Sequence, residues 1–457
     1  MNALNSIPKT HKTFKAPVRV GMLSLGCPKT LVDSEVILGK LDPAKYRLVS
    51  SVTDCDVALL NTCSFIEEAQ EESVGRILDL VELKKEKQIR AVIVMGCLVQ
   101  RFPKDLRDQL KEVDAFIGSG DYARIPELVE RVTQGEKVFS VGTPGYLATS
   151  GEVRVALTPA HYRYLKISEG CDHVCSFCTI PSFRGKHRSR TVDDVAAEAE
   201  RLVREGAKEI ILTGQDTTYF GRDHGDTFLL PQLLRRLDEI KGIEWLRLLY
   251  AYPSCITEEL MEAIGASRHV CHYLDMPLQH ASDRMLAAMR RGITKRRTAG
   301  LILKFRQTVP DLAIRTTFIV GFPGETEKDF EELLDFMREM HFERLGIFKY
   351  SREEGSAAAA LPGQVPEKIK QERFERAMAL QQEISRANNL RMLGKTLRVL
   401  VEGRDEKNPR LWTGRSFMDA PEVDGNVVVK TGKTLKTGSF YSVPITAVEA
   451  YDLVGEL

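Results

Sequence analysis

Short apolar runs alternate with amphipathic stretches over residues 17–150. The apolar runs predict four β-strands, at residues 18–25, 56–62, 91–96 and 115–120. The amphipathic stretches between them predict crossover helices, one of which is expected to be capped by Ser64. Strands that alternate with helices are typical of a parallel sheet covered on both faces. We therefore expect a small, doubly wound α/β domain.

The same alternation repeats six times between Tyr162 and Tyr350. The predicted strands are residues 163–168, 209–214, 244–251, 272–277, 313–321 and 343–350. Six units are too few for a closed eight-fold barrel, and too many for a second small sheet without duplication. We therefore expect a partial, open TIM-like barrel of (βα)6 type, with its chemistry at the C-terminal ends of the strands.

The last fifth of the chain has a different pattern. Residues 364–393 are charged and amphipathic, which predicts a long helix. The short β-type runs that follow are broken by Gly, Asp and Pro, which predicts a small antiparallel barrel. These patterns divide the chain into a flexible N-terminus (1–16), a first domain (17–150), a central domain with its linker helix (151–393) and a C-terminal domain (394–457).

Charge and targeting signals narrow the range of partners. The 457 residues hold 65 Lys and Arg against 64 Asp and Glu, so no net charge draws the chain to nucleic acid or membrane. The predicted C-terminal barrel is also balanced, whereas a module that grips RNA is expected to be basic. The first residues lack an apolar run, so they predict neither a signal peptide nor a membrane anchor. We expect a cytoplasmic enzyme.

Cys171, Cys175 and Cys178 form a C-x3-C-x2-C loop after the first strand of the central domain. Three thiolates at this spacing can ligate three irons of one cubane cluster. The fourth iron then stays open for a small molecule such as S-adenosylmethionine. The alternative is a zinc knuckle with His173 or His187 as fourth ligand, because structural zinc prefers four closed ligands.

Three further cysteines come just after strands of the first domain. Cys27, Cys63 and Cys97 follow the first three predicted strands. Because the carboxyl ends of parallel strands share one edge of a sheet, these thiols are expected to converge. Simple packing is the usual role of a free cysteine, but the repeated placement favours a second three-cysteine cluster. The remaining cysteines are assigned to packing: Cys55, Cys255 and Cys271.

Two other strand ends carry glycines. Gly214 and Gln215 end the second strand of the central domain, and residues 321–326, Gly-Phe-Pro-Gly-Glu-Thr, end the fifth. Glycine lets the backbone approach a ligand closely. An ordinary turn into the next helix is the alternative for each.

These motifs resemble the radical S-adenosylmethionine methylthiotransferases. The resemblance rests on Glu169 to Cys178 with Pro181 and Arg184-Gly185, and on residues 212–215, 277–279 and 321–326. Within that family, residues 24–35, 419–425 and 451–456 are similar to the protein-modifying branch. Thr30 departs from that branch, which commonly has Asn there.

The resemblance implies a cluster-bearing first domain, a radical S-adenosylmethionine barrel and a C-terminal TRAM domain. It also implies two 4Fe-4S clusters, with S-adenosylmethionine held by Gly214, Gln215 and Arg315; a structural salt bridge is an equal alternative for Arg315. The implied substrate is the β-carbon of an aspartate in ribosomal protein S-twelve, free or in the small subunit. An electron donor such as flavodoxin is the second expected partner.

Two competing functions stay open at this point. One is methylthiolation of a modified adenosine in tRNA, although the Gly-Cys-Gln-Met-Asn motif usual in that branch is absent after the first strand. The other is a zinc-bearing, ribosome-binding factor without catalysis. Because the predicted C-terminal barrel is balanced in charge, nucleic acid contact is expected to be secondary or absent, and membrane contact is not expected.

Overall fold

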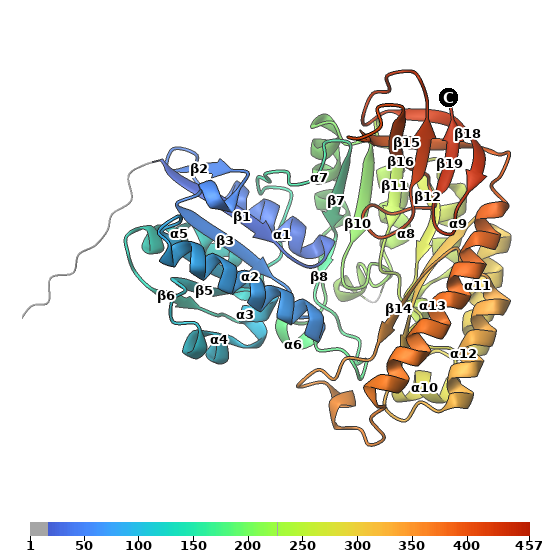
Figure 1. The fold of residues 1–457 in the computed structure, drawn as a ribbon, viewed down its shortest axis with the longest axis horizontal. Helices are drawn as coiled ribbons and strands as arrows, with labels where there is room; N and C mark the ends of the chain where they lie inside the picture. The colour runs from blue at the N-terminus through green and yellow to red at the C-terminus, as the bar shows by residue number, and fades with distance from the viewer. Residues whose placement is uncertain (1–16, 226) are drawn as a thin grey trace, which may run out of the picture. The chain divides into compact units, whose positions relative to one another are not determined.

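The computed structural model describes residues 17–225 and 227–457, and Figure 1 shows the fold. The expected flexible N-terminus, residues 1–16, lies outside the described residues. The chain forms two compact units. Of the described residues, the first unit contains 17–157 together with Thr179–Gly185, and the second contains Thr158–Cys178 and Lys186–Leu457.

The first unit is built on a six-stranded parallel sheet in the order β2-β1-β3-β4-β5-β6. Its strands are β1 (Val18–Ser24), β2 (Tyr46–Val49), β3 (Val57–Thr62), β4 (Ala91–Gly96), β5 (Ala115–Gly118) and β6 (Val138–Ser140). Its helices are α1 (Pro28–Gly39), α2 (Glu67–Lys85), α3 (Cys97–Arg101), α4 (Pro103–Gln109), α5 (Ile125–Thr133) and α6 (Ile180–Arg184).

Apolar cores cover both faces of this sheet. Side chains of α1 and α5 pack on one face, and those of α2, α3 and α4 pack on the other. The doubly wound parallel sheet predicted from the sequence is therefore confirmed. The predicted cap Ser64 is wrong: α2 begins after Ile66, whose extended backbone makes the cap without a side-chain hydrogen bond.

The second unit contains six parallel strands in the order β14-β13-β12-β11-β10-β7. The two edge strands are not paired with each other, so the barrel is open, as predicted. The strands are β7 (Tyr162–Lys166), β10 (Glu209–Thr213), β11 (Trp245–Leu248), β12 (Val270–Asp275), β13 (Ala313–Val320) and β14 (Arg344–Lys349). A separate antiparallel pair joins β8 (Ser168–Glu169) to β9 (Arg188–Ser189).

Helices cover the outside of these strands, and one long helix leads onward. The helices are α7 (Val192–Arg204), α8 (Leu230–Asp238), α9 (Glu258–Ala266), α10 (Asp283–Ala288), α11 (Lys295–Thr308), α12 (Glu327–Met340) and α13 (Glu367–Leu390). The predicted linker helix corresponds to α13, which packs against α12 and β14 (Figure 1). A capping box of Thr326 and Asp329 begins α12.

The C-terminal segment forms a closed barrel in the order β15-β16-β17-β19-β18. Its strands are β15 (Thr396–Arg404), β16 (Leu411–Arg415), β17 (Val427–Lys430), β18 (Phe440–Val448) and β19 (Leu453–Glu456). Neighbouring strands are antiparallel except β17 and β19, which are parallel. The small barrel predicted from the sequence is confirmed, with one parallel pair among its otherwise antiparallel strands.

Candidate functional site

Cys27, Cys63 and Cys97 lie at the carboxyl ends of three adjacent strands, β1, β3 and β4. Cys63 and Cys97 are buried, with 8% and 6% of their surface exposed, and Cys27 is half-buried. Every pair among the three interacts electrostatically. The structure therefore brings together three thiols that are distant in sequence.

The three thiols differ in acidity because their surroundings differ. Burial raises the pKa of Cys97 to about 12, although the nearby Arg184 opposes the shift. Burial also raises the pKa of Cys63. At Cys27, burial favours the neutral thiol, but the charge of Lys29 and the backbone of Thr30 outweigh it, so the pKa is lowered. Because the thiolate is the metal ligand, Cys27 is the most readily ionised of the three.

The surroundings of these thiols fit an iron–sulfur cluster. Gly26 has a φ of +92°, and a Cβ on it would lie 2.8 Å from Cys63 Cβ, so only glycine fits this approach. The Ser64 hydroxyl is buried without a hydrogen-bond partner in the part of the chain that the structure describes. Three thiols next to a hydroxyl that has no acceptor fit an iron–sulfur cluster, because the sulfurs of such a cluster accept hydrogen bonds.

Arg184, in α6, contacts the same group of cysteines. Its Nε–H donates to Cys97 Sγ over 3.2 Å, and its Nη1–H donates to Asp33 Oδ2 over 2.7 Å. Both charged side chains are buried. No role for Arg184 was derived from the sequence, although it belongs to the motif that follows the cysteine loop.

In the second unit, Cys171, Cys175 and Cys178 lie on the loop after β8, and all three are half-buried. Ser176 anchors the loop: its N–H and hydroxyl donate to the carbonyls of Met289 and Ala288, and its own carbonyl accepts from Ala358. Burial raises the pKa of Cys171 to about 12, and the two neighbouring thiols add to the shift. The three thiols therefore lie close together on a fixed loop.

The two histidines that could complete a zinc site have other partners. His173 Nε2 lies 2.6 Å from Asp216 Oδ2, and its ring stacks on Tyr252 with centroids 3.6 Å apart. His187 Nε2 lies 2.9 Å from Ser189 Oγ. His173, Asp216 and Cys255 do bring ligand atoms within 4.8 Å of one another. The contacts of both histidines favour a cluster held by three cysteines over a closed zinc knuckle.

Gly214 and Gln215 lie beside a set of unused polar atoms. A Cβ on Gly214 would lie 2.6 Å from Ser168 Oγ. Gln215 Nε2 donates to Glu169 Oε1 over 2.5 Å. Within the described ranges, three buried oxygens have no hydrogen-bond partner: Ser168 Oγ, Thr213 Oγ1 and Gln215 Oε1. Such atoms fit a polar ligand, because buried polar groups are nearly always paired.

Arg315 forms ion pairs with two carboxylates. Its guanidinium lies 2.8 Å from Asp275 Oδ1 and 3.3 Å from Asp424 Oδ1, where Asp424 comes from the C-terminal barrel segment. Both carboxylate side chains are almost fully covered, with 2% and 3% of their surface exposed, which supports the structural alternative for Arg315.

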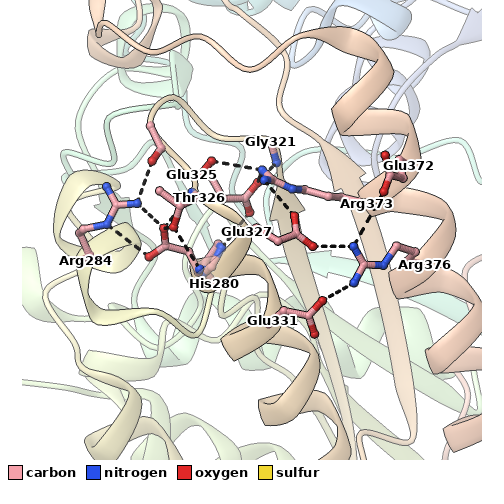
Figure 2. Close-up of polar contacts among 12 residues, drawn as sticks. His280, Arg284, Gly321, Glu325, Thr326, Glu327, Glu331, Glu372, Arg373 and Arg376 are labelled. Atoms are coloured by element: carbon pink, nitrogen blue, oxygen red, sulfur yellow. Dashed lines mark hydrogen bonds and ion pairs between the residues drawn. The ribbon is translucent and has the colours of Figure 1, made fainter.

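Glu325, in the loop after β13, is the centre of a buried charge network (Figure 2). Its carboxylate lies 3.0 Å from His280 Nε2 and 2.7 Å from Arg373 Nη1, and it accepts from the N–H of Gly321. The loop of residues 321–326 is thereby joined to α13. The remaining cysteines are buried, as expected for packing: Cys55, Cys255 and Cys271.

Comparison with known proteins places the three segments in named families. Residues 165–337 match the radical SAM superfamily, residues 19–118 match the uncharacterized protein family UPF0004, and residues 393–457 match the TRAM domain. Among solved structures, the radical S-adenosylmethionine methyltransferase TsrM from Kitasatospora setae has a TM-score of 0.56 at 14% identity over 73% of each chain. That likeness shows a shared fold.

Curated relatives match almost the whole chain. The ribosomal protein uS12 methylthiotransferase RimO of Pelotomaculum thermopropionicum is 50% identical over 96% of this chain and 99% of its own length. RimO of Desulforamulus reducens is 45% identical with the same coverage, and RimO of Syntrophotalea carbinolica is 46% identical over 96% of each chain. Within the described residues, no helix has the length and apolar character needed to cross a membrane. The chain therefore belongs to the ribosomal protein uS12 methylthiotransferase RimO family, within the radical SAM superfamily.

Proposed function

We propose that this protein is a radical S-adenosylmethionine enzyme that adds a methylthio group to the β-carbon of an aspartate in ribosomal protein uS12. The observation that carries the proposal is the pair of three-cysteine sets, one in each unit, in a chain that matches a RimO relative over 96% of its length. The required cofactors are two 4Fe-4S clusters and S-adenosylmethionine.

An aspartate β-carbon offers no acid, base or leaving group, so polar side chains cannot open its C–H bond. A bound 4Fe-4S cluster would supply the needed one-electron chemistry, which is the reductive cleavage of S-adenosylmethionine for removal of that hydrogen, with methionine and 5′-deoxyadenosine as by-products. Cys171, Cys175 and Cys178 are the proposed ligands. The hydrogen bonds of Ser176 hold their loop in place before the cofactor arrives.

Cys27, Cys63 and Cys97 are proposed to hold the second cluster and the sulfur that is transferred. The protein buries Cys63 and Cys97, and the absence of a side chain at Gly26 leaves room for Cys63. A second molecule of S-adenosylmethionine would supply the methyl group, with S-adenosylhomocysteine as the by-product. Gly214 and Gln215, beside three unpaired buried oxygens, are the proposed S-adenosylmethionine contacts.

The proposed setting is the bacterial cytoplasm, with uS12 free or in the small subunit and a one-electron donor such as flavodoxin. The balanced charge of the C-terminal barrel suits a basic ribosomal protein better than an RNA backbone. Contact with nucleic acid is therefore secondary in this proposal.

The test compares wild type with a Cys171, Cys175, Cys178 triple-alanine variant and with Cys63→Ala, all reconstituted anaerobically. Iron and sulfide analysis is expected to give about eight irons in wild type and about four in the triple variant. 5′-Deoxyadenosine is expected to be absent in the triple variant and retained in Cys63→Ala. Mass spectrometry of uS12 is expected to show methylthiolation in wild type alone. A methylthiolated product at the wild-type rate from Cys63→Ala would refute the second cluster.

A further inference from the structure

Arg291 lies against one cysteine of the loop in the second unit. Its Nη1–H donates to Cys175 Sγ over 3.4 Å, and its Nη2–H donates to the Pro277 carbonyl over 2.6 Å. The residue is only 4% exposed. Its Nε–H has no acceptor among the residues that the structure describes. A buried donor without an acceptor, next to a proposed cluster ligand, fits a group that carries its own sulfurs.

The position of Arg291 is fixed by an aromatic ring. The guanidinium carbon lies 4.0 Å from the centroid of Tyr252, and the Tyr252 hydroxyl donates to the Arg291 carbonyl over 3.1 Å. The same hydroxyl lies 3.8 Å from Cys175 Sγ. Contacts on both its backbone and its side chain therefore hold Arg291 beside the thiol.

The charge of Arg291 is not balanced locally. No carboxylate forms an ion pair with it in the described part of the chain, where its contacts are a thiol, a backbone carbonyl and an aromatic ring. Arg184, in the first unit, differs: it also donates to a cysteine, but it pairs with the buried Asp33. Because a guanidinium stays protonated, Arg291 brings a full positive charge to Cys175.

We propose that Arg291 is a positioning residue that acts through Cys175 to raise the reduction potential of the cluster on Cys171, Cys175 and Cys178. The proposal rests on the function proposed above. Reduction transfers one electron from a low-potential donor of the flavodoxin class to the cluster. No covalent bond changes and no proton moves, because the guanidinium is charged before and after. A hydrogen bond and a positive charge at a ligand sulfur stabilise the more negative, reduced state.

The test is an anaerobic redox titration followed by electron paramagnetic resonance, on reconstituted wild type, Arg291→Met and Arg290→Met. The signal missing from the triple-alanine variant identifies the relevant cluster. Arg290 is exposed, so its replacement removes the same charge one residue away, in water. At a fixed solution potential, the reduced-to-oxidised ratio is expected to fall about tenfold in Arg291→Met, which is about 59 mV for one electron. It is expected to stay unchanged in Arg290→Met. An unchanged potential in Arg291→Met would overturn the proposal.

A second measurement distinguishes an effect on the reduction potential from an effect on folding. Formation of 5′-deoxyadenosine is measured with flavodoxin and with the stronger reductant dithionite. With flavodoxin, the rate of Arg291→Met is expected to be about tenfold below that of wild type. With dithionite, most of this difference is expected to disappear. Equal losses with both reductants would mean a merely structural role and would overturn the proposal.

Arg291→Gln, which keeps a neutral donor, covers the case in which Arg291→Met takes up no iron. Its potential is expected to lie below that of wild type, and failure of both variants to take up iron would also overturn the proposal. The function itself is tested separately. If wild type cleaves S-adenosylmethionine but leaves uS12 unmodified, the proposed substrate is wrong, whereas the shift in potential still supports the role of Arg291.

Discussion

Arg415 of β16 donates to the Glu209 carboxylate of β10 over 2.7 Å, and both side chains are almost fully buried. The second oxygen of Glu209 accepts from Arg247 of β11, also over 2.7 Å. One carboxylate thus joins the C-terminal barrel to two strands of the open barrel within the second unit. Arg247 in turn donates to the carbonyl of Phe417, which strengthens the same junction.

Arg415→Met is predicted to lower the free energy of unfolding by about 3 kcal/mol, because Glu209 and Glu402 each lose one of their two cationic partners in a buried site. Chemical denaturation followed by circular dichroism measures this change. The control is Arg235→Met, which breaks an ion pair with Glu259 whose side chains are both more than half exposed; such a pair contributes at most about 1 kcal/mol. Equal losses in the two variants would contradict the prediction.

The pH dependence of stability follows from the same carboxylates. Burial disfavours ionised Glu209, but Arg415 and Arg247 outweigh it, so the pKa of Glu209 is lowered. The pKa of Glu402, a further partner of Arg415, is also lowered, because His161 and Arg415 outweigh the effect of burial. Carboxylates with a lowered pKa contribute stability above the ordinary pKa of about 4.3, and the contribution is lost as pH falls through the folded pKa.

We therefore predict that the free energy of unfolding decreases steeply below about pH 5. Denaturation curves between pH 7 and pH 3.5 measure the slope. Glu209→Gln is expected to be less stable at neutral pH and to show a shallower decrease, since it has no proton to gain at this site. A slope identical to that of wild type would show that Glu209 does not contribute.

Gly26→Ala is predicted to lose the second cluster and spare the first. A methyl group there would lie 3.0 Å from Cys63 Sγ, on a backbone whose positive φ disfavours alanine. Iron is expected to fall from about eight to about four per chain, with 5′-deoxyadenosine still formed and methylthiolation of uS12 lost. Gly75→Ala is the control, because Gly75 is an exposed residue of α2 with no described atom near the added methyl. Full iron content in Gly26→Ala would contradict this prediction.

Glu325→Gln is predicted to loosen α13. The buried Arg373 would lose its closest carboxylate, and breaking such a pair costs about 3 kcal/mol or more (Figure 2). Hydrogen exchange of residues 367–390 is expected to accelerate, measured by mass spectrometry. The control is Glu331→Gln, which removes a partly exposed partner of Arg376 in the same helix pair. Unchanged exchange in α13 would mean that the network does not hold this helix.

Pattern and spacing were enough to predict the parallel sheet, the open six-stranded barrel and the closed C-terminal barrel, because each rests on apolar periodicity. They were not enough for β2 and β6, which are edge strands of four and three residues with little apolar signal. The prediction for Ser64 was wrong because a serine before an amphipathic stretch is typical of a helix cap. In the structure α2 begins later, and the Ser64 hydroxyl is buried next to Cys63.

The convergence of Cys27, Cys63 and Cys97 could be predicted because strand ends of a parallel sheet share an edge. The arginines beside the thiols could not. Arg291 and Arg290 are adjacent in sequence, and only the fold decides that one is buried against Cys175 and the other is exposed. Arg315 shows the converse: the family resemblance suggested a ligand contact, with a salt bridge as the equal alternative, and its ion pair with Asp424 depends on a segment far along the chain.

Helix α6 begins two residues after Cys178, yet the segment Thr179–Gly185 folds with the first unit, where Arg184 donates to Cys97. The two compact units are therefore not two consecutive pieces of the gene product. A fragment that stops at Leu157 keeps all three cysteines of the first unit but lacks the arginine beside them. A truncation at Leu157 therefore yields an N-terminal piece with an incomplete site, whereas a truncation at Gly185 keeps Arg184 but also carries the cysteine loop that folds with the second unit.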